Sequence, residues 1–217
     1  MISERRNLYA IIFNFAIIVT AIFGVCFSVF LPNAEGIVTG VDSFKYFTVD
    51  GNIFCAVAAL IALISLIRGS HYSNRVFLLK FSAAVTGMLI FIVAMALVPF
   101  MGRSLIYETD MFILHILNPA FCLISFLLFD DRMIELRKRE ILYTLIPTII
   151  YGIIVIILCV VKVWTGDEIP YPFLDLYNNP IWASIVCMVG IGVLGAAIAF
   201  ILNKANIYFD TIMDQWD

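Results

Sequence analysis

Six long apolar segments constrain the fold of this chain more than any other feature of its sequence. An α-helix rises about 1.5 Å per residue, so roughly 20 apolar residues cross a hydrocarbon core about 30 Å thick. Backbone groups inside lipid must find hydrogen-bond partners within their own segment, which predicts helices here. The predicted spans are Leu8–Leu31, Tyr46–Ile67, Phe81–Phe100, Met111–Phe129, Leu142–Val163 and Pro180–Leu202.

Composition supports this interpretation. Hydrophobic residues make up 63% of the 217 residues and charged residues only 13%, whereas a soluble domain is nearer to half apolar and about a quarter charged. A β-barrel would need strands of about ten alternating residues, and the sequence has no such alternation. No linker or internal repeat divides the chain. We therefore expect an all-α polytopic membrane protein with a single domain over residues 1–217.

The distribution of Lys and Arg predicts the orientation of the six spans. If the N-terminus is cytoplasmic, ten of the thirteen basic residues fall in cytoplasmic segments, as the positive-inside rule requires. Both termini are then predicted to be cytoplasmic. The cytoplasmic set is Arg5, Arg6, Arg68, Arg75, Lys80, Arg132, Arg137, Lys138, Arg139 and Lys204, and the outer set is Lys45, Arg103 and Lys162.

Several classes of function find no support in the sequence. The basic stretch Asp130–Glu140 lacks interleaved aromatic residues, so we expect it to contact anionic lipid rather than nucleic acid. The cysteines all lie inside apolar segments without metal-ligand spacing, so neither a metal site nor a disulfide is expected. We expect no organic cofactor. The five cysteines are Cys26, Cys55, Cys122, Cys159 and Cys187.

Two polar side chains at similar depth suggest where chemistry could occur. Polar groups are costly in lipid. Thr48 follows the start of the second predicted span, and His115 follows the start of the fourth. A threonine hydroxyl becomes a nucleophile when a base such as imidazole lies within hydrogen-bond reach. The alternatives are that Thr48 caps its helix or bonds its own backbone, and that His115 makes a structural hydrogen bond.

Two asparagines share helix faces with these candidates. Asn52 is four residues after Thr48, and Asn118 is three residues after His115. Pro119 lacks an N–H, so the carbonyl of His115 loses its usual helical partner. The asparagines could orient the histidine, donate to an oxyanion, or join helices.

Small-residue pairs at Gly192/Ala196 and Gly195/Ala199 predict a closely packed helix beside the sixth span.

The last outer loop, Trp164–Asp175, is rich in aromatic residues. Aromatic residues are typical of the membrane interface. The loop is either an anchored cap or a lid over the Thr48–His115 level, with Tyr171, Phe173 and Asp175 as the candidate lid residues.

The ordered set of Tyr46-Phe47-Thr48, His115 with Asn118-Pro119, and Tyr171-Pro172-Phe173-Leu174-Asp175 resembles the androgen-induced and androgen-dependent TFPI-regulating family of membrane proteins and its bacterial relatives. The resemblance extends over nearly the whole chain. It implies an intramembrane threonine hydrolase of fatty acid esters of hydroxy fatty acids, with Thr48 as the nucleophile and His115 as the base. The mammalian members have a different sequence after the threonine, where this chain has Val49-Asp50-Gly51-Asn52.

We therefore expect a multi-pass protein of a bacterial plasma membrane that hydrolyses a lipid or fatty-acyl ester near the outer leaflet. Membrane lipids are its other expected partners. One alternative is a small transporter or channel, against which stand the scarcity of charge in the spans and the lack of paired broken helices. The other is a non-catalytic lipid-binding protein that keeps the same fold.

Overall fold

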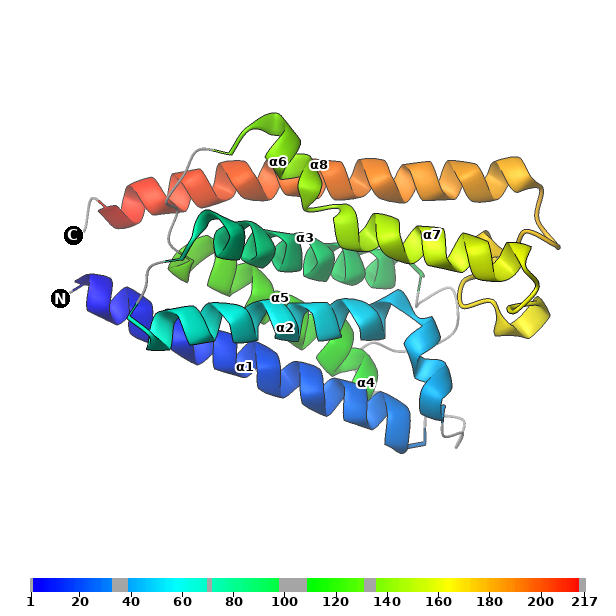
Figure 1. Ribbon diagram of the computed structural model, residues 1–217, viewed down its shortest axis with the longest axis horizontal. Coiled ribbons are helices and arrows are strands. Elements are labelled where there is room, and N and C mark those ends of the chain that lie inside the picture. Colours follow the sequence, from blue (N-terminus) through cyan, green and yellow to red (C-terminus); the bar gives the residue numbers. More distant parts are fainter. Residues whose placement is uncertain (1, 33–38, 70–71, 98–108, 131–135, 215–217) are drawn as a thin grey trace.

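The computed structural model describes residues 2–32, 39–69, 72–97, 109–130 and 136–214. Regular secondary structure in these ranges is helical. The long helices are α1 (Ile2–Phe30), α2 (Phe47–Ile67), α3 (Asn74–Leu97) and α8 (Ile181–Asp214). They run side by side as an up-and-down bundle, and both termini lie at the same end of it (Figure 1). We call that the terminal end, and the opposite end, where α1 finishes and α2 begins, the distal end.

Shorter helices complete the bundle. Between Thr109 and Phe129 the chain forms one continuous rod in which α-helical and π-helical turns alternate. The rod consists of α4 (Thr109–Phe112), the π-turn η3 (Ile113–Leu117), α5 (Asn118–Ile124) and the π-turn η4 (Ser125–Phe129). The others are η1 (Gly40–Lys45), α6 (Lys138–Tyr143), α7 (Ile146–Val160), η5 (Gly166–Glu168) and η6 (Pro172–Leu174).

Five helical segments of the described chain are long and apolar enough to cross a membrane, which makes this a multi-pass membrane protein. They are Arg6–Phe30, Phe47–Ile67, Asn74–Leu97, Thr109–Phe129 and Ile181–Ile212.

The predicted span Leu142–Val163 differs from what the structure contains. The helix is interrupted after Tyr143, where α6 ends. Helix α7 has only 15 residues, fewer than the roughly 20 that a span requires. Pro147 explains the break, because its ring clashes with the carbonyl four residues earlier, at Tyr143.

The third span also differs from the prediction. Helix α3 begins at Asn74 rather than at Phe81, so Lys80 lies inside a helix and not in a loop. Ser73 starts the helix, because its side chain accepts a hydrogen bond from the Val76 N–H at 3.3 Å. The predicted end at Phe100 lies outside the described residues, as do Arg103 and Arg132 of the charge argument.

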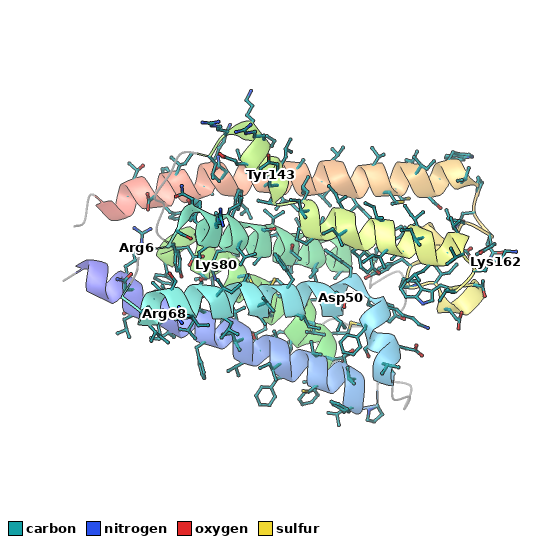
Figure 2. The ribbon with its side chains drawn as sticks, viewed as in Figure 1. Arg6, Asp50, Arg68, Lys80, Tyr143 and Lys162 are labelled. Carbon is teal, nitrogen blue, oxygen red and sulfur yellow. The ribbon has the colours of Figure 1, made fainter. Side chains whose placement is uncertain are left out.

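Helix α3 forms the centre of the bundle. Its side chains Phe77, Phe81 and Leu89 are almost completely buried. Apolar side chains of α1, α7 and α8 point outward in large number, as they must where helices face lipid. Figure 2 shows Arg6 and Arg68 at the terminal end and Lys162 at the distal end. Arg6 forms an ion pair with Asp210 of α8 at 2.7 Å, which holds the two ends of the chain together.

Small residues let the helices approach each other closely. A Cβ added to Gly24 of α1 would lie 2.5 Å from a methyl carbon of Leu114. A Cβ on Gly87 of α3 would lie 3.3 Å from the Pro119 backbone. On α8, a Cβ on Gly195 would lie 2.8 Å from Leu145, as the predicted close packing requires. Gly192 instead faces open space, so for this residue the prediction is wrong.

Candidate functional site

Thr48 and His115 meet at the distal end of the bundle. Thr48 is the second residue of α2, and His115 lies in the π-turn η3. The Thr48 hydroxyl oxygen is 3.1 Å from Nε2 of His115. The sequence places both residues at one depth, and the structure adds that their helices are neighbours. Tyr46 holds the position that caps α2, so the alternative in which Thr48 is the cap is wrong.

The second ring nitrogen of His115 fixes the direction of the proton in this pair. Nδ1 lies 3.0 Å from the carbonyl oxygen of Met111. A carbonyl only accepts hydrogen bonds, so Nδ1 carries a hydrogen, and when the ring is neutral Nε2 presents its lone pair. The Thr48 hydroxyl therefore donates to Nε2. This is the arrangement in which a base can remove the proton of a nucleophile.

The π-helical turn sets the position of His115. The N–H of Asn118 bonds to the carbonyl of Ile113, five residues earlier. Pro119 follows at once and cannot donate to the His115 carbonyl. A wider turn accommodates this proline without ending the helix. Single π-turns of this kind frequently occur at functional sites.

Asn52 and Asn118 join helices beneath the pair. Asn52 donates to the Thr48 carbonyl at 2.7 Å and to the Leu114 carbonyl at 3.0 Å. Asn118 donates to the side-chain oxygen of Asn52 at 2.6 Å and accepts from Thr20 at 2.8 Å. Both amide hydrogens of Asn52 are thus engaged by backbone carbonyls. This favours helix joining over donation to an oxyanion for Asn52.

Tyr171 of the last loop reaches the same place. Its phenol oxygen accepts a hydrogen bond from the Phe47 N–H at 3.1 Å. Its ring packs edge-on against Tyr46 with 6.0 Å between centroids. Burial raises the pKa of Tyr171 to about 12, while a hydrogen bond with the Thr48 side chain acts in the opposite direction. The phenol is therefore protonated at neutral pH and lies beside the threonine hydroxyl.

The other two candidate lid residues lie farther along the loop. Phe173 stacks on Tyr171, with centroids 5.3 Å apart and ring planes 16° apart. Asp175 instead organises its own turn. Its carboxylate accepts the backbone N–H groups of Tyr177 and Asn178 and the side-chain amide of Asn178 at 2.6 Å. The hydrogen bonds from Asn178 and Tyr177 hold the pKa of Asp175 below its usual value.

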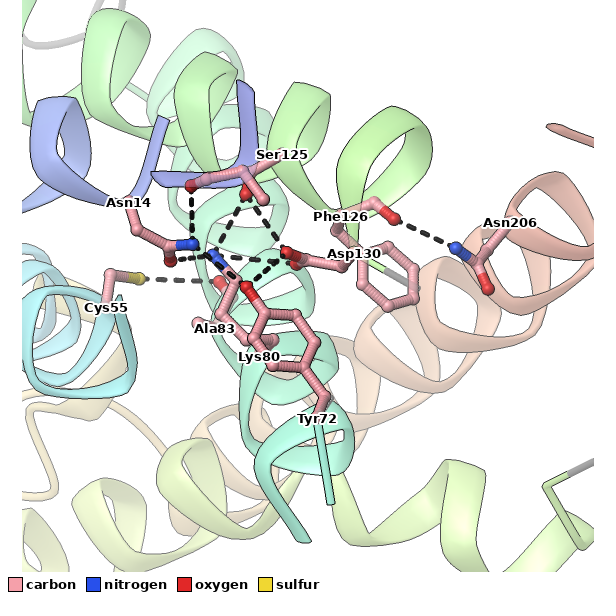
Figure 3. A network of polar contacts seen from close by, with 10 residues as sticks. Asn14, Cys55, Tyr72, Lys80, Ala83, Ser125, Phe126, Asp130 and Asn206 are labelled. Carbon is pink, nitrogen blue, oxygen red and sulfur yellow. Dashed lines mark hydrogen bonds and ion pairs between the residues drawn. The ribbon is translucent and has the colours of Figure 1, made fainter. Parts of the chain in front are cut away.

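A second polar cluster lies inside the bundle (Figure 3), and Figure 2 shows its member Lys80 toward the terminal end. The ammonium of Lys80 is 3.5 Å from Oδ2 of Asp130. Lys80 also donates to Asn14 at 2.8 Å and to Ser125 at 3.1 Å, and the Tyr72 hydroxyl donates to Asp130 at 3.2 Å. Each of these five side chains is buried. The cluster connects α1, α3 and η4.

Sequence reasoning missed this cluster by placing Lys80 and Asp130 in cytoplasmic loops. A signal was present, because the residues 76–79 just before Lys80 are all apolar. The apolar segment therefore continues past the lysine on both sides.

Among the residues that the structure describes, no group of three or more His, Cys, Asp or Glu side chains is placed to hold a metal ion.

Comparisons of this chain with protein-family models, with curated proteins and with solved structures gave no match. The family resemblance therefore remains a prediction from the sequence.

The Lys80–Asp130 pair generates a stability prediction. Lys80→Met leaves the Asp130 carboxylate buried without its cation, which should cost roughly 3–5 kcal/mol of unfolding free energy. The double variant Lys80→Met/Asp130→Asn removes both charges and should recover most of that loss. Unfolding in detergent by heat or by SDS measures both. A double variant no more stable than Lys80→Met contradicts the assignment of the ion pair.

Proposed function

We propose that this protein is an intramembrane hydrolase of lipid esters in which Thr48 is the nucleophile and His115 is the base. The observation that carries the proposal is the 3.1 Å contact between the Thr48 hydroxyl and Nε2 of His115, with Nδ1 held by the Met111 carbonyl. The family resemblance, which rests on the sequence, implies the same pair. It also suggests fatty acid esters of hydroxy fatty acids as the substrate class.

The acylation step follows from the direction of the Thr48 hydrogen bond. The Thr48 oxygen attacks the ester carbonyl carbon while its proton passes to Nε2 of His115. The tetrahedral intermediate then expels the alcohol oxygen, which takes the proton from Nε2. The acyl group stays on Thr48 as an ester.

Deacylation repeats these transfers with water. His115 accepts a proton from water as the water oxygen attacks the acyl carbonyl. The Thr48 oxygen then leaves and recovers the proton from Nε2. The products are a free carboxylic acid and the restored threonine hydroxyl, so bonds and protons balance over the cycle.

We assign stabilisation of the oxyanion to Tyr171. The phenol oxygen accepts the Phe47 N–H, so the phenol's own hydrogen is directed at its other partner, the Thr48 side chain. The donor is therefore already placed beside the atom to which the oxyanion carbon would be bonded. Burial keeps the phenol protonated. A tyrosine hydroxyl is one of the side-chain donors that stabilise the negative charge of a tetrahedral intermediate.

We further propose that α6 and α7 together make a sixth crossing, with the termini cytoplasmic and the site near the outer leaflet. The termini at one end of the bundle support an even number of crossings (Figure 1). The excess of Lys and Arg in the segments on the terminal side supports the orientation. Lipid would then enter between helices and water from the distal end.

The transporter alternative gains one observation, the charged Lys80–Asp130 pair within the bundle. The scarcity of charge in the spans is therefore a weaker argument against it than the sequence indicated. The pair nevertheless has fixed partners in Asn14 of α1, Ser125 of η4 and Tyr72 just before α3. These contacts suit a structural role better than a role that requires the charges to move.

Labelling with a fluorophosphonate probe tests the nucleophile. We expect an adduct on residue 48 in the wild type and in Thr48→Ser, and no adduct there in Thr48→Ala. In His115→Ala, labelling and ester turnover should fall by about 10²–10⁴-fold, because the base is gone. Peptide mass mapping locates the adduct, and thermal unfolding checks that each variant folds. A folded wild type without adduct or ester turnover rules out the hydrolase and leaves lipid binding or transport.

Tyr171→Phe tests the oxyanion donor. The ring and its stacking on Phe173 remain, but the hydroxyl is lost, so kcat should fall about 10²-fold with KM little changed. Thermal stability serves as the control. An unchanged or higher kcat would mean that the phenol does not stabilise the oxyanion.

Reporter fusions test the proposed topology. Green fluorescent protein fused after Asp217 should fluoresce, and alkaline phosphatase at the same position should be inactive, because that end is cytoplasmic. Phosphatase inserted in the loop at Gly166 should be active. The reverse pattern at either position contradicts the orientation.

A further inference from the structure

An apolar groove of about 280 Å³ lies between α3 and α8 toward the distal end. Its walls are one face of α3 between Ile92 and Leu97, one face of α8 between Cys187 and Leu194, and the ring of Phe173. Apart from the Cys187 thiol, the lining side chains are hydrocarbon. The groove belongs to parts of α3 and α8 that are long and apolar enough to lie in the membrane.

The groove opens on the lipid-facing side of α8. Cys187 is exposed, and so are its neighbours Val186 and Val189. Gly190 keeps the groove open, because no atom lies within 4 Å of the position where its Cβ would be. A larger residue here would occupy the space without displacing a neighbour.

The lining determines what can occupy this space. A bound water needs two to four polar partners, and these walls supply only a thiol. A dry cavity of about 150 Å³ holds benzene, so this groove has room for a longer hydrocarbon. Between Cys187 and Leu194 it runs about 10 Å along α8. Its chemistry and shape suit an alkyl chain.

One wall of the groove, the ring of Phe173, is also connected to the Thr48 site. Phe173 stacks on Tyr171 at 5.3 Å, and the Tyr171 hydroxyl accepts the Phe47 N–H next to Thr48. A chain leaving an ester carbonyl at Thr48 would pass over this aromatic pair and enter the groove. We infer that the groove binds the acyl chain of the ester substrate. The identity of the chain rests on the proposed hydrolase function, whereas binding of hydrocarbon does not.

Two glycines of α8 provide a matched test. Gly190→Leu fills the groove, while Gly192→Leu adds the same side chain two residues away, where a Cβ also meets open space outside the groove. The probe is palmitic acid with a diazirine near its methyl end and an alkyne tag. We expect adducts on the groove residues of α3 and α8 that excess palmitic acid removes. Labelling should fall at least fivefold in Gly190→Leu and remain unchanged in Gly192→Leu.

The outcomes separate this inference from the function. If excess palmitic acid does not reduce the labelling, or if Gly190→Leu and Gly192→Leu are labelled equally, the probe contacts the protein as bulk lipid does. Either result contradicts binding in the groove. Competed labelling lost in Gly190→Leu, without a fluorophosphonate adduct on Thr48, supports the groove and rejects the hydrolase. Palmitoyl-ester turnover that is equal in both variants rejects the groove as the acyl site and keeps the hydrolase. Cys187→Phe fills the same space and replaces Gly190→Leu if that variant does not fold.

Discussion

The hydrogen-bonded chain from Thr20 through Asn118 and Asn52 fixes where α2 meets η3, and the geometry of the candidate site depends on it. Its last links end on the carbonyls of Thr48 and Leu114, the residue before His115. Inside a bilayer no water can replace a lost partner. Sliding α2 by one residue would therefore leave several buried polar groups unsatisfied. The distance between nucleophile and base follows from the packing of the helices below them.

The bundle has two polar regions with different consequences. At the distal end, Thr48 and His115 are half-buried, and neither side chain is a carboxylate or an ammonium group. Toward the terminal end, Lys80 and Asp130 carry formal charges and are completely enclosed. Such a pair adds little net stability compared with apolar residues, but removing one partner is costly. We interpret the Lys80–Asp130 pair as an interaction that determines which faces of α1, α3 and η4 pack together.

Much of this architecture was predictable from the sequence, because apolar length alone determines a membrane helix. Five predicted spans correspond to helices that could cross a membrane. Pro147 could have predicted the break after Tyr143, since proline acts on the residue four positions earlier. Thr48 and His115 were expected at a similar depth, but the partners of Asn52 depend on which helix faces meet. The role of Asp175 is local, because it accepts hydrogen bonds from Tyr177 and Asn178, two and three residues later. Lys80 was misplaced although apolar residues precede it, because its partner Asp130 is 50 residues away in sequence and no local pattern identifies that partner.

The ion pair between Arg6 and Asp210 affects how the protein can be made. The two residues are 204 positions apart in the chain, so α1 must enter the membrane long before its partner leaves the ribosome. The contacts of α1 with α2, α3 and α5 can form while synthesis continues, because all those helices precede α8. The bond from Asn206 to the Phe126 carbonyl has the same dependence on the last helix. The contacts of α8 at the terminal end of the bundle therefore form only after α8 has been translated.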